Sequence, residues 1–331
     1  DLKLSGGSII RGDARLVGLP IIDETFIDLD LTNSYAVTED LKKYLRERTY
    51  RRLAPLRNIG FNANFFGFVN DFVANGDFFT EYGRITSDIN LKLQDEVNNS
   101  SYRGALKMIN FDLGGYTSNE LFGKVTLDGK ISGKGFTLNQ ADFVLDGKID
   151  SIGLNDYVFH AIETNARFTK EFFEGDVKVN DPNLKLDLNG SIDVRGGVDF
   201  FNVRAKLDTA FLSKLNFTEE PVFISSDLNV NAQGLKVDNI LGMANFKNTT
   251  VRRGGQELRI DSLGIISDRD EAVRNVFIST NLFNAKIDGR FNFSTVYKEI
   301  NKLLFEYQLN LENDKVALET YYNSKHERPP D

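Results

Sequence analysis

The 331-residue sequence contains no cysteine, no tryptophan, two histidines and two methionines. Without cysteine, the chain forms no disulfide and has neither a thiolate zinc site nor a cysteine nucleophile. No stretch of the sequence approaches the roughly 18 consecutive apolar residues of a membrane-spanning helix. These absences remove several classes of chemistry before any pattern is considered.

An excess of positive charge is also lacking. The 40 basic and 48 acidic residues give a net charge of −8. Phosphate groups repel an acidic protein, so we expect no nucleic-acid partner. The acidic residues are spread along the chain, which is typical of a solvated face.

The motifs of common enzymes are missing as well. His160 lies in the alternating stretch "YVFHAIETNARF" and His326 in the polar C-terminal segment, and nothing marks a nucleophile elbow beside either. "GKGFTLNQ" lacks the Lys-Ser/Thr of a phosphate-binding loop, and Asp268 and Asp270 in "ISDRDEA" lack the central glycine of a calcium loop. We therefore predict a protein that is not an enzyme and has no cofactor and no metal site; a carboxylate pair for glycoside hydrolysis stays open.

What the sequence does have is period-two alternation of apolar and polar residues, which predicts β-strands. Gly, Asn and Asp clusters separate the alternating stretches, and we count roughly twenty strands at a spacing of about 8–15 residues. The chain is thus predicted to be mostly β. The following residues are predicted to share the apolar face: Ile85, Ile89, Leu91, Val125, Leu127, Phe143, Leu145, Leu184, Leu186, Leu188, Val203, Leu228, Val230, Ile287 and Phe291.

Two amphipathic helices interrupt the strands. The first is predicted near residues 38–54, with Thr38 as N-cap and Pro55 as its end. The second is predicted near residues 294–304, with Ser294 as N-cap. We find no internal domain boundary, and we treat residues 1–331 as one unit.

A short unit recurs four times, at residues 127–131, 145–149, 188–192 and 287–291. Each copy has a bulky apolar residue, Asp or Asn, Gly, a polar residue and another bulky apolar residue. The unit fits a two-residue hairpin turn, or a continuous strand that bends at its glycine. Because the alternation continues through Gly190 and Gly289, the sequence favours the continuous strand.

Strands with one apolar face must cover that face. A second sheet covers it in a sandwich, closure covers it in a barrel, and a curled antiparallel sheet leaves a trough. A trough lined by Phe, Leu and Ile would suit acyl chains, because each buried methylene contributes about 0.8 kcal/mol. In a closed sandwich the same residues would be core.

One segment carries a resemblance to a known family. Residues 153–197, "GLNDYVFHAIETNARFTKEFFEGDVKVNDPNLKLDLNGSIDVRGG", resemble the TamB (translocation and assembly module) family of Bacteroidota. The match rests on Tyr157, Phe159, Phe173-x-Gly175, the run Asp181 to Leu184, and Gly190. Residues 56–93 and 101–136 are similar to glycine-bearing strands of the family, with Phe65-Phe66 where one Phe-x-Gly is usual. His160 stands where the family often has Asn.

The resemblance implies membership of the AsmA-like group of bridge-like lipid-transfer proteins. It implies a β-taco fold with an apolar groove, and a periplasmic location within an inner-membrane-anchored protein that reaches the outer membrane. The implied partners are phospholipid acyl chains and an outer-membrane Omp85-type barrel. The chain would be a middle section of the bridge, with the membrane anchor outside it.

We therefore expect a non-enzymatic periplasmic bridge that carries phospholipids between the two membranes through its groove and supports outer-membrane biogenesis. An alternative is an assembly module that holds strands of outer-membrane proteins by β-augmentation. A surface β-solenoid that binds polysaccharide or a receptor is a third interpretation, and the position of most Phe residues on the apolar face argues against it.

Overall fold

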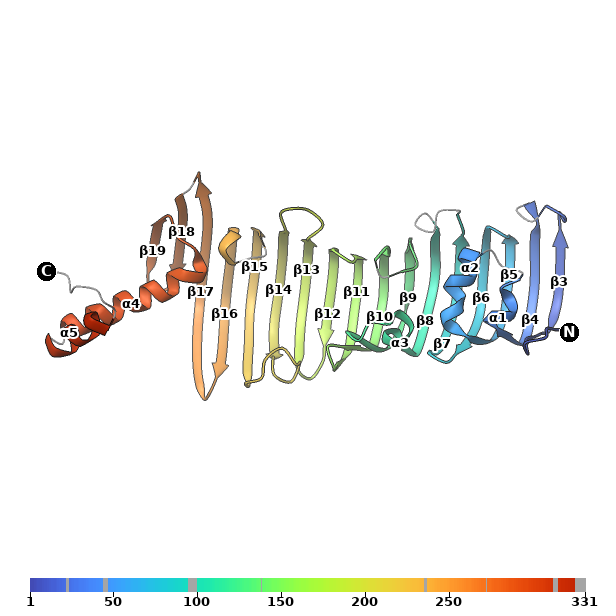
Figure 1. Ribbon diagram of the computed structural model, residues 1–331, viewed down its shortest axis with the longest axis horizontal. Helices are drawn as coiled ribbons and strands as arrows, with labels where there is room; N and C mark the ends of the chain where they lie inside the picture. The colour runs from blue at the N-terminus through green and yellow to red at the C-terminus, as the bar shows by residue number, and fades with distance from the viewer. Residues whose placement is uncertain are drawn as a thin grey trace.

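The computed structural model describes residues 1–21, 24–43, 47–94, 100–137, 139–234, 237–271, 273–311 and 315–324. Its main element is a single nineteen-stranded sheet. Every strand from β3 to β18 pairs antiparallel with the strand that follows it in sequence, and β2 joins β1 to β4. The strands therefore succeed one another along the long axis of the molecule in chain order (Figure 1).

The strand bounds are β1 (Leu2–Lys3), β2 (Ile9–Ile10), β3 (Gly12–Val17), β4 (Phe26–Val37), β5 (Asn58–Phe68), β6 (Asp71–Thr80), β7 (Gly83–Lys92), β8 (Ser101–Asp112), β9 (Phe122–Lys134), β10 (Asp142–Leu154), β11 (Tyr157–Thr169), β12 (Phe172–Asn180), β13 (Leu184–Asp193), β14 (Phe200–Phe211), β15 (Val222–Gln233), β16 (Leu241–Arg253), β17 (Gln256–Asp270), β18 (Val273–Thr280) and β19 (Asn284–Gly289).

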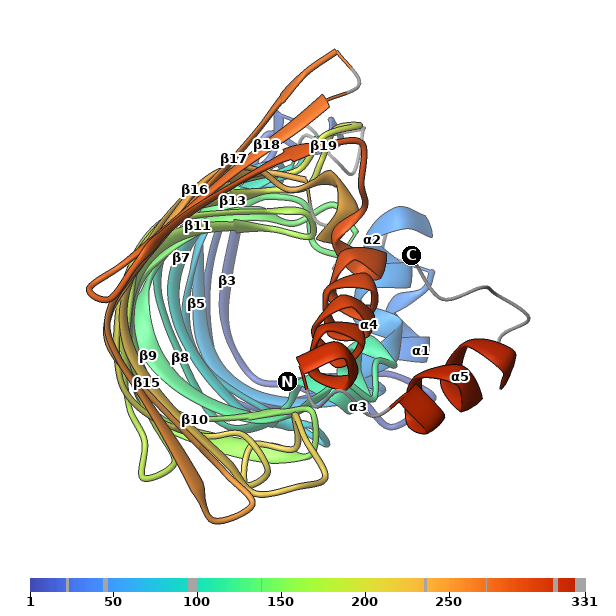
Figure 2. The same ribbon diagram turned by 90° about the vertical axis from the view of Figure 1, so that its left-hand side faces the viewer.

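Each strand bends along its length, so that the sheet forms an open C when seen along the long axis in Figure 2. Within the described residues, no pairing joins β3 to β19, so the sheet is not closed into a barrel. The α-helices lie on the hollow side of the C (Figure 2). The predicted fold class, a mostly β chain with an elongated curled antiparallel sheet, is confirmed.

The helices differ from the prediction in number and length. The described residues form α1 (Thr38–Leu41), α2 (Glu47–Leu53), α3 (Leu113–Thr117), α4 (Phe293–Leu311) and α5 (Lys315–Ser324), with short 3-10 turns η2 (Ala54–Leu56) and η4 (Val237–Asn239). The first predicted helix is thus two helices, and residues 44–46 between them lie outside the described residues. The second begins one residue before the predicted start and continues seven residues beyond the predicted end at 304.

Both predicted N-caps are wrong. Val37 precedes α1, and Thr38 instead donates its backbone N–H and its hydroxyl to the carbonyl of Arg57, at 2.8 and 3.0 Å. Ser294 lies inside α4, where its N–H and hydroxyl donate to the carboxylate of Asp238 at 2.8 and 2.7 Å. A carboxylate from a distant turn thus satisfies a donor at the start of this helix.

Three copies of the recurring unit lie inside continuous strands, as the favoured interpretation requires. Gly129, Gly147 and Gly190 are in β9, β10 and β13, whereas Gly289 is the last residue of β19. Gly129 and Gly147 are direct cross-strand partners, and a Cβ on Gly147 would lie 2.6 Å from the Cα of Gly129. The glycines therefore allow neighbouring backbones to approach more closely than any side chain permits.

Gly190 gives a direct test of this close approach. Its φ is +150°, and a Cβ there would lie 2.1 Å from the carbonyl oxygen of Asn202 on β14. We expect Gly190→Ala to lower the free energy of unfolding by about 2 kcal/mol, because the substitution forces backbone strain and a strand shift. Urea denaturation followed by circular dichroism measures the change.

The matched control is Gly197→Ala, since a Cβ at Gly197 meets nothing within 4 Å. This variant should unfold at the urea concentration of the wild type. Equal stability of the two variants would contradict the role assigned to Gly190.

Candidate functional site

The most continuous feature of the sheet is a row of apolar residues that crosses it from β3 to β19. In this central row each residue is the direct partner of the next in the strand register, and none has a polar side chain. Its members are Ala14, Leu29, Phe65, Ala74, Ile89, Gly104, Ile131, Leu145, Ala166, Gly175, Gly190, Val203, Val230, Ala244, Ile265, Ile278 and Ala285.

Rows on either side of the central row share its face, because side chains two residues apart along a strand point the same way. One flanking row contains no charged residue from Leu16 to Ile287, and another contains none from Gly12 to Thr280. With adjacent strands about 4.8 Å apart, the uncharged surface extends for about 80 Å.

This apolar face is the concave one. The ring of Phe111, which is paired with Val125, contacts the ring of Tyr116 in α3 at a centroid distance of 5.6 Å. The guanidinium of Arg274 on β18 lies 4.4 Å from the ring centroid of Phe293 at the start of α4. Since α3 and α4 lie on the hollow side of the C, the residues they contact face that side (Figure 2).

The structure brings together fourteen of the fifteen residues predicted to share an apolar face. Nine lie in the central row or the two flanking rows, and Ile85, Leu127 and Leu186 share one further row on the same face. Val125 and Leu184 follow on this face of β9 and β13. Phe291 is the exception, since it follows the end of β19 and its ring contacts that of Phe293 at 5.9 Å.

The concave face is not sealed like the core of a sandwich. Among the fifteen predicted residues only Val125, Leu145 and Val203 are buried, at 3%, 7% and 8% exposure. The other twelve are half-buried. In the described part of the chain no second sheet covers this face, so its apolar side chains remain within reach of a ligand.

Phenylalanine rings reinforce one edge of the face. Phe143, Phe168 and Phe173 are consecutive partners across β10, β11 and β12, and both ring-centroid distances are 5.6 Å. Cross-strand aromatic pairs contribute about 0.5–1.5 kcal/mol each beyond the area they bury. They stabilise the sheet where it has no second layer to pack against.

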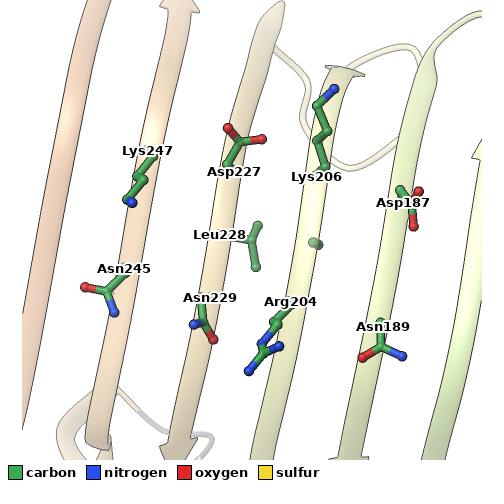
Figure 3. Close-up of a pocket in the computed structure, with 10 residues that line it drawn as sticks. Asp187, Asn189, Arg204, Lys206, Asp227, Leu228, Asn229, Asn245 and Lys247 are labelled. Carbon is green, nitrogen blue, oxygen red and sulfur yellow. The ribbon is translucent and has the colours of Figure 1, made fainter.

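The convex face is polar and carries ion pairs between neighbouring strands. Examples are Arg84–Asp77 at 2.9 Å and Arg167–Asp142 at 2.8 Å, each with an exposed arginine and a half-buried aspartate. Figure 3 shows a shallow depression on β13–β16, where acidic, basic and amide side chains alternate, so that no strong charge of one sign accumulates. Its charged lining residues are Asp187, Arg204, Lys206, Asp227 and Lys247.

The histidine of the resemblance segment belongs to a polar cluster around Asp181, which is completely buried. The Asp181 carboxylate accepts hydrogen bonds from the Tyr157 hydroxyl at 2.6 Å, the Asn183 N–H at 2.8 Å and the His160 N–H at 3.0 Å. The His160 ring nitrogen Nδ1 lies 3.2 Å from the carboxylate. The cluster ties the β12–β13 turn to the start of β11, and none of its hydrogen-bond partners among the described residues is a serine, threonine or cysteine.

Hydrogen bonding controls the charge of this buried acid. Burial by itself would raise the pKa of Asp181, but the bonds from Tyr157, Asn183 and His160 outweigh it and lower the pKa. Burial and the neighbouring carboxylate raise the pKa of Tyr157. Asp181 is therefore ionised at neutral pH and Tyr157 remains a donor.

The described part of the chain offers few other candidates for a metal site or a membrane span. No group of three or more His, Cys, Asp or Glu residues there could hold a metal ion. No described helix is long and apolar enough to cross a bilayer. His326 lies outside the described residues.

Sequence reasoning missed the small members of the rows, such as Gly104, Ala166 and Gly175, because hydrophobicity does not mark them. It also missed Arg274, a nearly fully buried charge on the concave side of β18. Arg274 lies two and four residues before Val276 and Ile278, and this period-two spacing could have placed it on the apolar face from the sequence.

Comparison with known proteins adds no relative. No family model matches the chain, and no curated protein and no solved structure match it.

The Asp181 cluster predicts a pH-dependent stability. A lowered pKa means that the folded state prefers the carboxylate, so the stabilisation is fully present above the unfolded pKa of about 3.9 and is lost as the pH falls through the folded value. We expect Asp181→Asn to lower the free energy of unfolding by about 1–3 kcal/mol at pH 7. It should also weaken the fall in wild-type stability below pH 4.

Urea denaturation at pH 7 and pH 3 measures both effects. Asp187→Asn, on the exposed convex face of β13, serves as control and should retain the wild-type profile. If the Asp181 variant also kept the wild-type profile, the buried hydrogen bonds would not hold the turn.

Proposed function

We propose that this chain is a non-enzymatic lipid conduit whose concave face holds phospholipid acyl chains. The observation that carries the proposal is the continuous uncharged face across seventeen strands, apolar and only half-buried. Acyl chains gain about 0.8 kcal/mol for each methylene removed from water, and a surface with no charge along its length presents no desolvation barrier to their movement.

The cellular setting of the proposal rests on the resemblance to the TamB family. On that basis the chain is a section of a periplasmic bridge that carries phospholipids between the inner and outer membranes and supports outer-membrane biogenesis. Its membrane anchor would lie outside this section, and an Omp85-type barrel would be its outer-membrane partner.

A second function is supported by the free edge of the sheet. Among the described residues β3 pairs on one side only, with β4, and every residue of β3 is exposed. Such an edge is able to accept a further strand, which is what an assembly module for outer-membrane proteins requires. In that function the backbone edge would matter and the concave side chains would matter little.

Lipid extraction and mass spectrometry of the purified chain separate the two functions. We expect more than one phospholipid per chain, well above the amount in a tag-matched soluble β-protein. Lipid at the control level would contradict the conduit and favour the assembly module.

Charge placed on the concave face should remove the lipid. Val230 is in the central row and Leu188 in a flanking row, and both are half-buried. We expect Val230→Asp and Leu188→Asp each to reduce copurified phospholipid about tenfold, since a carboxylate beside an acyl chain must be desolvated.

The matched control is Asn231→Asp, which adds the same charge to the neighbouring exposed position of β15. It should leave the lipid content unchanged, and circular dichroism confirms that all three variants are folded. Retention of lipid by both concave-face variants would argue against the conduit.

A further inference from the structure

Arg274 is the one strongly buried basic side chain in the described part of the chain, with 1% of its surface exposed. It lies on the concave side of β18, two residues before Val276 of a flanking row. Val276 is itself 2% exposed and pairs with Ile287. A guanidinium thus stands directly beside the uncharged surface.

The guanidinium has donors that the described residues do not satisfy. Nη2 donates to the backbone carbonyl of Asp238, whereas the buried Nε and Nη1 have no hydrogen-bond partner. Buried donors are nearly always paired in folded proteins, because an unpaired one forfeits its hydration. An acceptor from outside the described chain would satisfy them.

The positive charges of Arg274 and Arg269 are only partly balanced, by the nearby Asp238 carboxylate. Arg269 on β17 is its direct cross-strand partner, and like charges in that position destabilise a sheet. The Asp238 carboxylate is engaged by Ser294, and no described carboxylate forms an ion pair with Arg269 or Arg274. Burial and the charge of Arg269 lower the pKa of Arg274 by more than the charge of Asp238 raises it, and an anion between the two arginines would raise it again.

We propose that Arg274 and Arg269 bind the phosphate of an anionic lipid whose acyl chains lie on the adjacent concave face. The proposal rests on the proposed function and adds the class of headgroup. Arginine suits it because its planar fork of donors matches phosphate oxygens. The apolar rows and the two guanidinium groups together fit a molecule with a hydrocarbon tail and an anionic head.

Helix α4 controls access to this site. The ring of Phe293 covers the guanidinium, and the two hydrogen bonds from Ser294 to Asp238 hold the first turn of the helix in place. Beyond this turn the helix runs past the last strand (Figure 1). A headgroup reaches Nε and Nη1 when the first turn lifts, so weakening the Ser294 bonds should favour binding.

Isothermal titration calorimetry with two short-chain lipids tests the proposal. Dioctanoyl phosphatidate and dioctanoylglycerol share their acyl chains and differ in the phosphate. We expect the wild type to bind phosphatidate about tenfold more tightly, as a charge-assisted bidentate contact provides. Arg274→Met should equalise the two affinities and leave dioctanoylglycerol binding unchanged, and Arg269→Gln should reduce the preference.

The control is Arg103→Met on the exposed convex side of β8, which removes the same charge and should preserve the preference. Ser294→Ala should tighten phosphatidate binding only. Circular dichroism verifies folding, and the exposed Arg269 gives an independent variant if Arg274→Met unfolds.

Each other outcome is decisive. If the wild type binds both lipids equally, the headgroup site is overturned while the conduit stands. If it binds neither, the conduit fails and the headgroup site with it. If inorganic phosphate bound with the affinity of phosphatidate and Arg274→Met abolished this binding, the site would be one for a free oxyanion. That result would overturn the lipid assignment.

Discussion

The register of hydrogen bonds between neighbouring strands is the constraint on which the rest of this structure depends. Side chains alternate between faces, so a slip of one residue in any strand would place its apolar set on the convex side and its charged set on the concave side. The central row stays apolar through sixteen successive pairings, and the register shifts, such as those between Leu31 and Ser34 and between Met108 and Phe111, lie outside it. Asp181 illustrates how this is secured, since it ties the turn that follows β12 to residues at the start of β11. The ion pairs between neighbouring strands on the convex face are consistent with the same register.

Curvature then follows from what the rows contain. A single sheet has no second layer on which to pack, and its apolar side chains reduce their exposure by converging on the inside of the C. Convergence needs space, and the pair Gly129–Gly147 provides it between β9 and β10. Most apolar side chains on the concave face nevertheless remain half-exposed, which leaves a favourable free energy of about 25 cal/mol for every Å² that an apolar ligand would cover. An apolar ligand that bound this face only in the folded state would therefore stabilise the fold.

The strands and the shared apolar face could be predicted because alternation is a local signal. Leu184, Leu186 and Leu188 belong together whatever surrounds them. The choice among sandwich, barrel and open sheet could not be made from the residues, since it depends on which strands are neighbours. The prediction of Thr38 as an N-cap was wrong because its side chain donates a hydrogen bond to the carbonyl of Arg57, nineteen residues away. Arg274 escaped notice for a related reason, as its burial is produced by Phe293 and Asp238 from separate segments.

The strand order has a consequence for the growth of such a chain. In the described part of the chain, every strand from β5 to β18 pairs only with its predecessor and its successor, so most contacts of each hairpin are with its two neighbours. Longer links such as the hydrogen bonds between Asn155 and Asn216 are few. Nearest-neighbour architectures fold by propagation from any nucleus, and their stability is a sum over adjacent units. A hairpin gained or lost through duplication or deletion changes the span by about 10 Å and leaves the remaining units intact. The length of the sheet is thus adjustable in steps of two strands.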